Sequence, residues 1–256
     1  MVPLLPAGAR PVRVGFASDL HLGPTTPARL LDAAFGYLEG AELDVLLLGG
    51  DYVFLEATAA KARELAARVA AVPARRKLAV LGNHDLWTSH GTLEAALRGV
   101  GVEVLVNESV ALGGGVQVVG LDDPWTGRRD TAQAFTGMGD AHAVVVLCHS
   151  PDSLWDAKSA VPEGVAAFYV CGHTHGGHLA TPWGPLVVPG PVGKRYPRGE
   201  HQIGSLRLCV SRGVGGIELP IRTYARPEVH VFELVTSSSV RGAAPTSAAD
   251  PGGAEP

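Results

Sequence analysis

The stretch VCGHTHGGH (residues 170–178) places three histidines within six positions, at the end of the apolar run AAFYVCGH (166–173). A short, continuously apolar run predicts a strand that is buried on both faces. A single histidine after such a strand is commonly a core residue that has found a hydrogen-bond partner. His173 and His175, however, stand two residues apart on a glycine-rich turn, which is typical of ligands for a positively charged ion.

Four other runs share this composition and also end in a polar residue or glycine. They are VRVGFAS (12–18), LDVLLLGG (43–50), KLAVLGN (77–83) and AVVVLCH (143–149). Segments with helical spacing and a high Ala, Leu, Glu and Arg content alternate with the first of these strands, at residues 27–41, 55–72 and 91–101. Alternating strands and helices predict an α/β architecture.

The pattern changes in the second half of the chain, where strands follow one another with tight turns. Residues 102–123, 204–216 and 228–235 have this character. We therefore predict a four-layer α/β/β/α sandwich, in which two packed mixed sheets are flanked by helices. The domain is predicted to span residues 12–235, after an N-terminal extension (1–11). Residues 236–256 are rich in Ser, Ala, Pro and Gly, and we expect them to be a disordered tail.

The overall composition argues against several classes of protein. The chain has 256 residues, a net charge of −4 and three cysteines. With no global positive field, stable nucleic-acid binding is not expected. The sparse, odd set of cysteines argues against a disulfide framework. No signal peptide or membrane-spanning run is recognised, which predicts a cytoplasmic location and leaves peripheral membrane contact open.

Polar donors follow all five apolar runs, and they should meet because ligands bind at the carboxyl ends of strands in open α/β sheets. In an extended chain, residues two apart leave the same face, so Asp19 and His21 could reach one ion. One catalytic ion usually takes three protein ligands. Seven nitrogen and oxygen donors therefore indicate two ions with a bridging carboxylate. The donors are Asp19, His21, Asp51, Asn83, His149, His173 and His175.

Each motif taken alone has an ordinary structural explanation. A lone Asp-x-His pair is a weak signal, GNHD could be a simple turn, and His149 could close a loop. These explanations would have to hold independently at five successive strand ends, so the metal interpretation is favoured. Cys148 and Cys171 lie near predicted ligands, but we interpret both as core residues.

The ordered motifs SDLH, GD, GNHD, CH and GHTH resemble those of the calcineurin-like metallophosphoesterase superfamily, over about residues 12–235. The GHTHGG extension and the segment SRGVGGIELPIRTYARPEV resemble a bacterial subgroup of membrane- or cell-wall-associated phosphoesterases. One relative of that subgroup hydrolyses the pyrophosphate of UDP-2,3-diacylglucosamine. His178 departs from the subgroup, which usually has Gln there, so we assign it no metal.

The resemblance implies a division of roles among the matching residues. Asp19, His21 and His175 would hold one metal, and Asn83, His149 and His173 the other. Asp51 would bridge the two ions, and a hydroxide held between them would attack phosphorus in line. His84 would face the substrate phosphate, where it stabilises charge or protonates the leaving oxygen. Asp85 is expected to orient His84.

The resemblance and the donor chemistry leave the substrate and the metal open. A phosphodiester or phosphomonoester is the first expectation, a nucleotide-linked lipid pyrophosphate the alternative, and a non-catalytic metal-binding scaffold or a DNA nuclease the less favoured readings. Nitrogen and oxygen ligands suit Mn²⁺ first, with Fe or Zn next. Basic residues on two Gly- and Pro-rich loops (120–130 and 189–201) could reach a small phosphoester or nucleotide-linked substrate. They are Arg128, Arg129, Lys194, Arg195 and Arg198.

Overall fold

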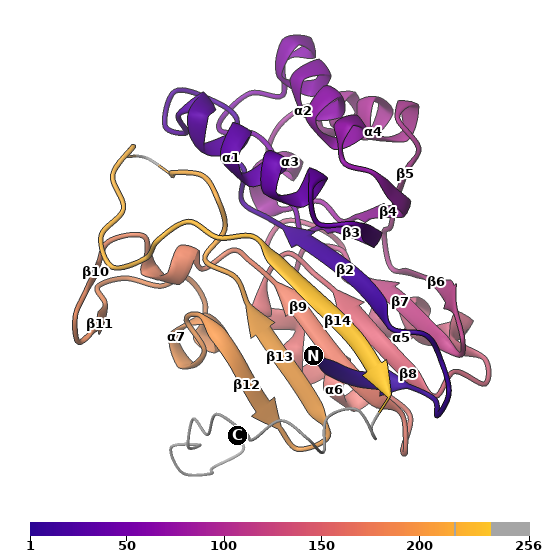
Figure 1. The fold of residues 1–256 in the computed structure, drawn as a ribbon. Coiled ribbons are helices and arrows are strands. Elements are labelled where there is room, and N and C mark those ends of the chain that lie inside the picture. Colours follow the sequence, from indigo (N-terminus) through magenta and orange to yellow (C-terminus); the bar gives the residue numbers. More distant parts are fainter. Residues whose placement is uncertain (218, 237–256) are drawn as a thin grey trace.

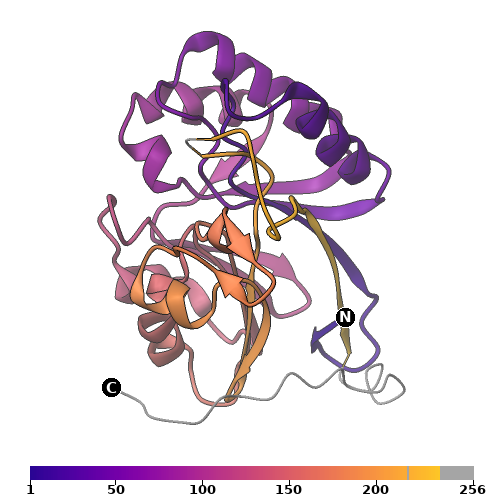
Figure 2. The ribbon, with the colours of Figure 1, turned by 90° about the vertical axis from the view of Figure 1, so that its left-hand side faces the viewer.

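The computed structural model describes residues 1–217 and 219–236 of the chain. Two six-stranded sheets pack face to face, and helices cover the outer face of each sheet (Figure 1 and Figure 2). The predicted α/β/β/α sandwich of two mixed sheets is confirmed.

The first sheet is built mainly from the alternating strand and helix segments. Its strands in spatial order are β1 (Val2–Leu5), β14 (His230–Thr236), β2 (Val12–Ala17), β3 (Leu43–Leu48), β4 (Ala74–Ala79) and β5 (Val102–Val104). From β2 to β5 neighbouring strands are parallel, whereas β14 runs antiparallel to β2. The helices on its outer face are α1 (Ala28–Glu39), α2 (Ala59–Ala71) and α4 (His90–Gly99). The side chain of Thr58 caps α2 by accepting a hydrogen bond from the Lys61 N–H.

The second sheet holds most of the strands of the second half, whereas β5 and β14, which fall in the predicted segments 102–123 and 228–235, belong to the first sheet. Its order is β12 (Gly199–Ile203), β13 (Leu206–Val210), β9 (Ala166–Cys171), β8 (Ala143–Leu147), β7 (Val116–Gly120) and β6 (Glu108–Gly113). The four central strands are parallel, and the two edge strands are antiparallel to their neighbours. Short helices lie against this sheet: α5 (Thr131–Phe135), α6 (Leu154–Ala160) and α7 (Pro191–Arg195).

Three hydrophobic clusters fill the three spaces between the four layers. The middle cluster packs the sheets together, and the rings of Phe168 and Phe232 meet edge to face within it at 5.0 Å between centroids. A second cluster lies under α1, α2 and α4, and the third under the short helices of the second sheet. Because both faces of β8 and β9 are covered, the sequences of these two strands are continuously apolar rather than alternating.

Some elements differ from the sequence prediction. The strand β1 pairs in parallel with β14 and was not predicted. The 189–201 segment, expected to be a loop, contains α7 and the start of β12. Of the tail expected to be disordered, only Thr236 is described, as the last residue of β14; residues 237–256 lie outside the described part of the chain. Within residues 1–217 and 219–236, no helix is long and apolar enough to cross a membrane.

Candidate metal centre

The predicted donors lie on five loops that leave the carboxyl ends of β2, β3, β4, β8 and β9. Asn83 begins the short helix α3 (Asn83–Leu86), and His175 begins a single 3₁₀ turn (His175–Gly177). All seven side chains are buried: Asp19, His21, Asp51, Asn83, His149, His173 and His175. The fold therefore brings together all the residues that the motifs single out.

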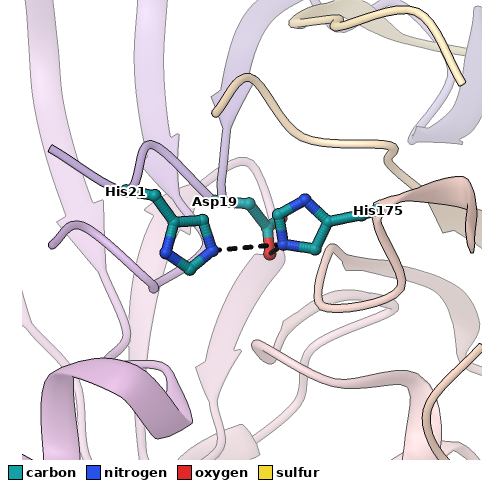
Figure 3. Close-up of side chains that lie close together, drawn as sticks. All are labelled: Asp19, His21 and His175. Carbon is teal, nitrogen blue, oxygen red and sulfur yellow. Dashed lines mark hydrogen bonds and ion pairs between the residues drawn. The ribbon is translucent and has the colours of Figure 1, made fainter. Parts of the chain in front are cut away.

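The first group consists of Asp19, His21 and His175, whose ligand atoms all lie within 4.8 Å of one another. The His21 and His175 Nε2 atoms are 3.1 Å apart, and Asp19 Oδ1 is 3.3 Å from His175 Nε2 (Figure 3). When both rings are neutral, two Nε2 atoms this close cannot both carry a proton, so at least one of them presents a lone pair to the other and to the carboxylate. A divalent cation accepts all three lone pairs at once.

The second group consists of Asp51, His149 and His173, again within 4.8 Å. The His149 Nε2 atom is 3.1 Å from Asp51 Oδ2 and 3.1 Å from His173 Nδ1. Asn83 completes this group, because its Oδ1 is also 3.1 Å from His149 Nε2. These four side chains form one buried group that could hold a metal ion.

Asp51 connects the two groups. Its Oδ2 lies 3.1 Å from His149 Nε2 in the second group and 3.6 Å from His21 Nε2 in the first. Its Oδ1 accepts a hydrogen bond from the backbone N–H of His84. A carboxylate in this position can serve two cations at once.

The tautomer of His149 supports a cation at this point. Its Nδ1 is 2.8 Å from the carbonyl oxygen of Gly49, which can only accept, so Nδ1 carries a proton. In the neutral ring, Nε2 is then a bare lone pair that faces the oxygens of Asp51 and Asn83. Three acceptors that face one another repel unless a positive charge lies among them, either a proton or a metal ion. The donor chemistry therefore fits divalent metal ions.

The pKa values of the buried carboxyl and imidazole groups also favour a cation at this site. Burial lowers the pKa values of His21 and His173 to about 3, so both rings are neutral and have a free lone pair. Burial raises the pKa of Asp19 to about 6, although the nearby His149 opposes this. Burial also acts to raise the pKa of Asp51, but the adjacent His149 outweighs it and lowers that pKa. Burial acts to lower the pKa of His149, but the adjacent Asp51 outweighs it and raises that pKa well above its usual range. The carboxylates therefore favour a positive charge at His149, where a proton or a metal ion could supply it.

The local backbone differs from the extended chain that was expected after β2. Asp19 has φ of 54° and His21 has φ of 44°, both in the left-handed region. The two side chains reach the same group because a tight loop turns them inward, and not because they alternate along a strand. His173 and His175 adopt the same unusual conformation, with φ of 69° and 51°. Such strain is concentrated at functional sites.

Two glycines of the motifs are explained by close approach to the carboxylates. A Cβ atom on Gly82, which precedes Asn83, would lie 2.2 Å from Asp51 Oδ1. A Cβ atom on Gly172 would lie 2.1 Å from Asp19 Oδ2. Any side chain at either position would displace a predicted ligand.

His84 lies beside the centre with its ring against two neighbours. The ring is edge-on to His21 at 4.9 Å and to Trp87 at 4.6 Å between centroids. It is partly exposed, as a group that contacts substrate must be, and burial lowers its pKa. The ring is therefore neutral at neutral pH and carries one N–H for donation.

The structure gives Asp85 different partners from the one expected. Its carboxylate accepts hydrogen bonds from the backbone N–H groups of Gly82 and Tyr52, at 3.0 and 2.8 Å, and a longer one from Val53. It thus ties the loop after β4 to the loop after β3, which carries Asp51. We therefore describe Asp85 as a positioning residue for these two loops, and not as the partner of the His84 ring. Burial raises its pKa to about 7.

Sequence reasoning missed two further groups of residues at the site. The exposed ring of Trp125 lies 5.1 Å from the His173 ring, and its Nε1 donates to Asp152. The guanidinium of Arg222 donates to the carbonyl oxygens of His175, Gly213 and Gly215 and so braces the turn that carries His175. The sequence could have pointed to Trp125, because this tryptophan directly follows the DDP turn. No local pattern around Arg222 indicates a role at the site.

The remaining candidates lie apart from the ligand groups. The His178 Nε2 atom is 3.1 Å from the carbonyl oxygen of Leu219. Cys148 and Cys171 are buried in the cluster beneath the second sheet, as expected of core residues. Two of the loop arginines have protein partners, since Arg129 pairs with Asp156 and Arg198 donates to the Tyr224 carbonyl. Arg128, Lys194 and Arg195 are exposed.

Comparison with known proteins agrees with this geometry. Residues 12–210 match the calcineurin-like phosphoesterase superfamily domain. The chain is 29% identical over 249 residues to the uncharacterized metallophosphoesterase YkuE of Bacillus subtilis, covering 92% of this chain and 83% of YkuE. It is 30% identical to the phosphodiesterase YaeI of Escherichia coli, covering 89% and 83%. It is 24% identical to the UDP-2,3-diacylglucosamine pyrophosphatase LpxG of Chlamydia muridarum, covering 88% and 84%.

The family match spans both sheets and all seven predicted metal donors, and the relatives extend over most of their own length. The two buried groups supply the nitrogen and oxygen donors that divalent metals take. The chain therefore belongs to the calcineurin-like phosphoesterase superfamily and is a metal-dependent phosphoester hydrolase.

Proposed function

We propose that the protein hydrolyses phosphodiesters with two divalent metal ions. Asp19, His21 and His175 would hold one ion, and Asn83, His149 and His173 the other. Asp51 would bridge them, and His84 would be the catalytic residue that contacts the substrate phosphate. A cytoplasmic location, expected from the sequence, stays a prediction.

The position of Asp51 is the observation that carries this proposal. One carboxylate oxygen lies within 3.6 Å of a ligand nitrogen from each group. Two independent mononuclear sites would not need a carboxylate within reach of both groups. A single carboxylate between two triads is the arrangement that a two-metal centre requires.

Two divalent ions in such a centre supply Lewis acidity and a bound water of lowered pKa. The residues themselves fix the geometry, since His149 is oriented by the Gly49 carbonyl and Asp51 by the His84 N–H. Nitrogen and oxygen donors without a thiolate favour Mn²⁺, with Fe or Zn as the next candidates.

His84 would act as a hydrogen-bond donor to the substrate. Because its pKa is lowered by burial, its ring is neutral and donates from one nitrogen. A neutral imidazole can stabilise charge that develops on a phosphoryl oxygen, or it can deliver a proton to the leaving oxygen as it departs.

The preference for diesters is supported by the Escherichia coli relative, whose name is phosphodiesterase. A direct test compares bis-(p-nitrophenyl) phosphate with p-nitrophenyl phosphate on Mn²⁺-loaded protein. We expect the larger kcat/KM for the diester. A much larger kcat/KM for the monoester would contradict the diester assignment while leaving the metal centre intact.

Metal stoichiometry is a separate test of the centre. Protein purified without chelator and then reloaded should approach two ions per chain by elemental analysis. A plateau at one ion per chain in saturating Mn²⁺ would contradict the two-metal proposal.

A nucleotide-linked lipid pyrophosphate is the second candidate substrate. The exposed rings of Trp87 and Trp125 flank the centre, beside His84 and His173 respectively. Flat aromatic surfaces suit a nucleobase or an acyl chain, and the relative LpxG is named for such a substrate. Assaying a UDP-linked glycolipid beside the simple diester distinguishes the two candidates.

A further inference from the structure

Six large apolar side chains are exposed on two adjoining segments that follow the centre. One segment is the hairpin of β10 (Ala180–Thr181) and β11 (Gly184–Pro185) with the residues after it, and the other is the loop 219–224. We call these residues the hairpin surface: Trp183, Leu186, Val187, Leu219, Ile221 and Tyr224. Trp183, at the hairpin tip, is 92% exposed. Large side chains exposed together in this way mark interaction sites.

Hydrogen bonds hold the two segments together as one surface. The Ala180 N–H donates to the Thr223 carbonyl, and the Thr223 N–H donates to the His178 carbonyl. Figure 1 shows the hairpin at the left-hand edge of the molecule, and Figure 2 shows it from that side, in front of the other elements. The apolar side chains are therefore displayed on an ordered, hydrogen-bonded unit.

Exposed basic residues occur close to this surface in the sequence. Of the seven Lys and Arg in residues 174–227, Arg207 pairs with Glu200 and Arg212 with Glu228, so the exposed charge comes from other residues. Lys194, Arg195 and Arg226 are exposed in this stretch. Apolar side chains among exposed basic residues are the composition that binds anionic lipid surfaces.

We propose that the hairpin surface docks on an anionic lipid bilayer, with Trp183 and its apolar neighbours in the interface. Tryptophan favours the boundary between headgroups and acyl chains, and the basic residues would face the lipid phosphates. A second copy of the chain fits less well, because a symmetric contact would bring the exposed basic residues of both copies together.

This docking would bring the membrane close to the metal centre. His178 begins the hairpin segment, and its ring lies 5.9 Å from that of the predicted ligand His175. A phosphoester carried by a lipid could then reach the centre while its acyl chains stay in the bilayer. The docking itself does not depend on the proposed activity, so vesicle binding can be measured without any substrate.

The test is sedimentation of the full chain with vesicles of phosphatidylglycerol and phosphatidylcholine, compared with phosphatidylcholine alone. We expect binding to the anionic vesicles and weaker binding at about 1 M salt, where the Debye length is about 3 Å. Trp183→Ser should lower the partition coefficient about tenfold, because one large interfacial side chain is lost. Lys194→Gln with Arg226→Gln should weaken binding to anionic vesicles only.

A matched control is Tyr37→Ser, which removes an exposed aromatic side chain from α1. It should bind vesicles as the unmodified protein does, and metal content should be unchanged in all variants. Failure of the unmodified protein to sediment with anionic vesicles would overturn the proposal. So would equal binding by Trp183→Ser, or a dimer in solution that Trp183→Ser converts to monomer, which would assign the surface to a second copy.

Discussion

The backbone N–H of His84 donates a hydrogen bond to Oδ1 of Asp51 over 2.9 Å. This bond uses the main chain of the proposed substrate-contacting residue to orient the proposed bridging ligand. The imidazole of His84 takes no part in it. Metal binding and substrate contact should therefore be separable by mutation, although they meet at one hydrogen bond.

Asp51→Asn tests the bridging position. The neutral amide keeps the size of the side chain but loses the charge that offsets the repulsion between two cations. We expect the metal content to fall below two ions per chain and activity to fall with it, both measured on the same preparation. Asp32→Asn is the matched control, because Asp32 is an exposed carboxylate paired with Arg68, and it should change neither quantity. Full metal occupancy in Asp51→Asn would contradict the bridging role.

His84→Ala tests the substrate contact. The backbone bond to Asp51 persists in the variant, so two metals and the fold should be retained. Turnover should fall about 10²- to 10⁴-fold, the usual range for one positioned acid or electrostatic donor. His90→Ala, in the neighbouring helix α4, should behave as the unmodified protein. Loss of a metal from His84→Ala, or normal turnover, would show that GNHD has been interpreted wrongly.

The leaving group separates the two ways in which His84 could act. If His84 protonates the leaving oxygen, the His84→Ala defect should shrink for p-nitrophenolate, which needs little protonation. If it stabilises charge on the phosphoryl oxygens, the defect should be similar for good and poor leaving groups. A series of aryl diesters measured on both proteins gives the answer.

Much of this architecture could be predicted because the buried strands carry strong local signals. Continuous apolar runs at β8 and β9 reflect burial on both faces, and the polar residues that follow them mark the carboxyl edge. The strand β1 could not be predicted, because VPLL is short and contains a proline. It owes its conformation to parallel pairing with β14, which lies at the far end of the described chain. Such tertiary pairing leaves no local pattern.

The site was predictable at the level of residue identity but not of local geometry. The left-handed conformations of Asp19 and His21 arise from a loop that hydrogen-bonds to the segment after β3, where the His21 N–H donates to the Asp51 carbonyl. The partners of Asp85 are backbone amides on that same segment. Sequence spacing alone favours the ring of the neighbouring His84 as the partner of Asp85. A contact between two loops leaves no pattern in the sequence.

Trp125 is expected to contact the organic part of the substrate. Its ring lies beside His173 and is held by the Nε1 bond to Asp152, at 2.9 Å. Trp125→Ala should raise KM for bis-(p-nitrophenyl) phosphate about two- to tenfold, as loss of one aromatic contact predicts, with little change in kcat. Trp125→Phe should restore most of the binding. Trp183→Ala, which removes an exposed tryptophan from the hairpin, should leave KM for this soluble substrate unchanged.

The last prediction concerns the pH dependence of stability and the carboxylate of Glu228. Burial alone would raise its pKa, but hydrogen bonds from His230 and Arg212 lower it from 4.5 to about 2. The Arg212 backbone N–H and Nε each lie 2.8 Å from its oxygens. Because the folded pKa is below the unfolded one, Glu228 stabilises the fold above about pH 4.5, and this contribution is lost as the pH falls towards 2.

Glu228→Gln should therefore lower the free energy of unfolding near neutral pH by between about 1 and 3 kcal/mol. One pKa unit corresponds to about 1.4 kcal/mol, and the amide of the variant can still accept one hydrogen bond, which reduces the loss. Urea unfolding of both proteins at neutral pH and near pH 2 measures the difference. The difference should shrink at the lower pH, where the carboxyl is protonated in the unfolded chain and about half protonated in the folded protein. Glu233→Gln, on the exposed face of β14, is the matched control and should have little effect at either pH. A Glu228→Gln difference that stays constant with pH would assign the effect to packing rather than to charge.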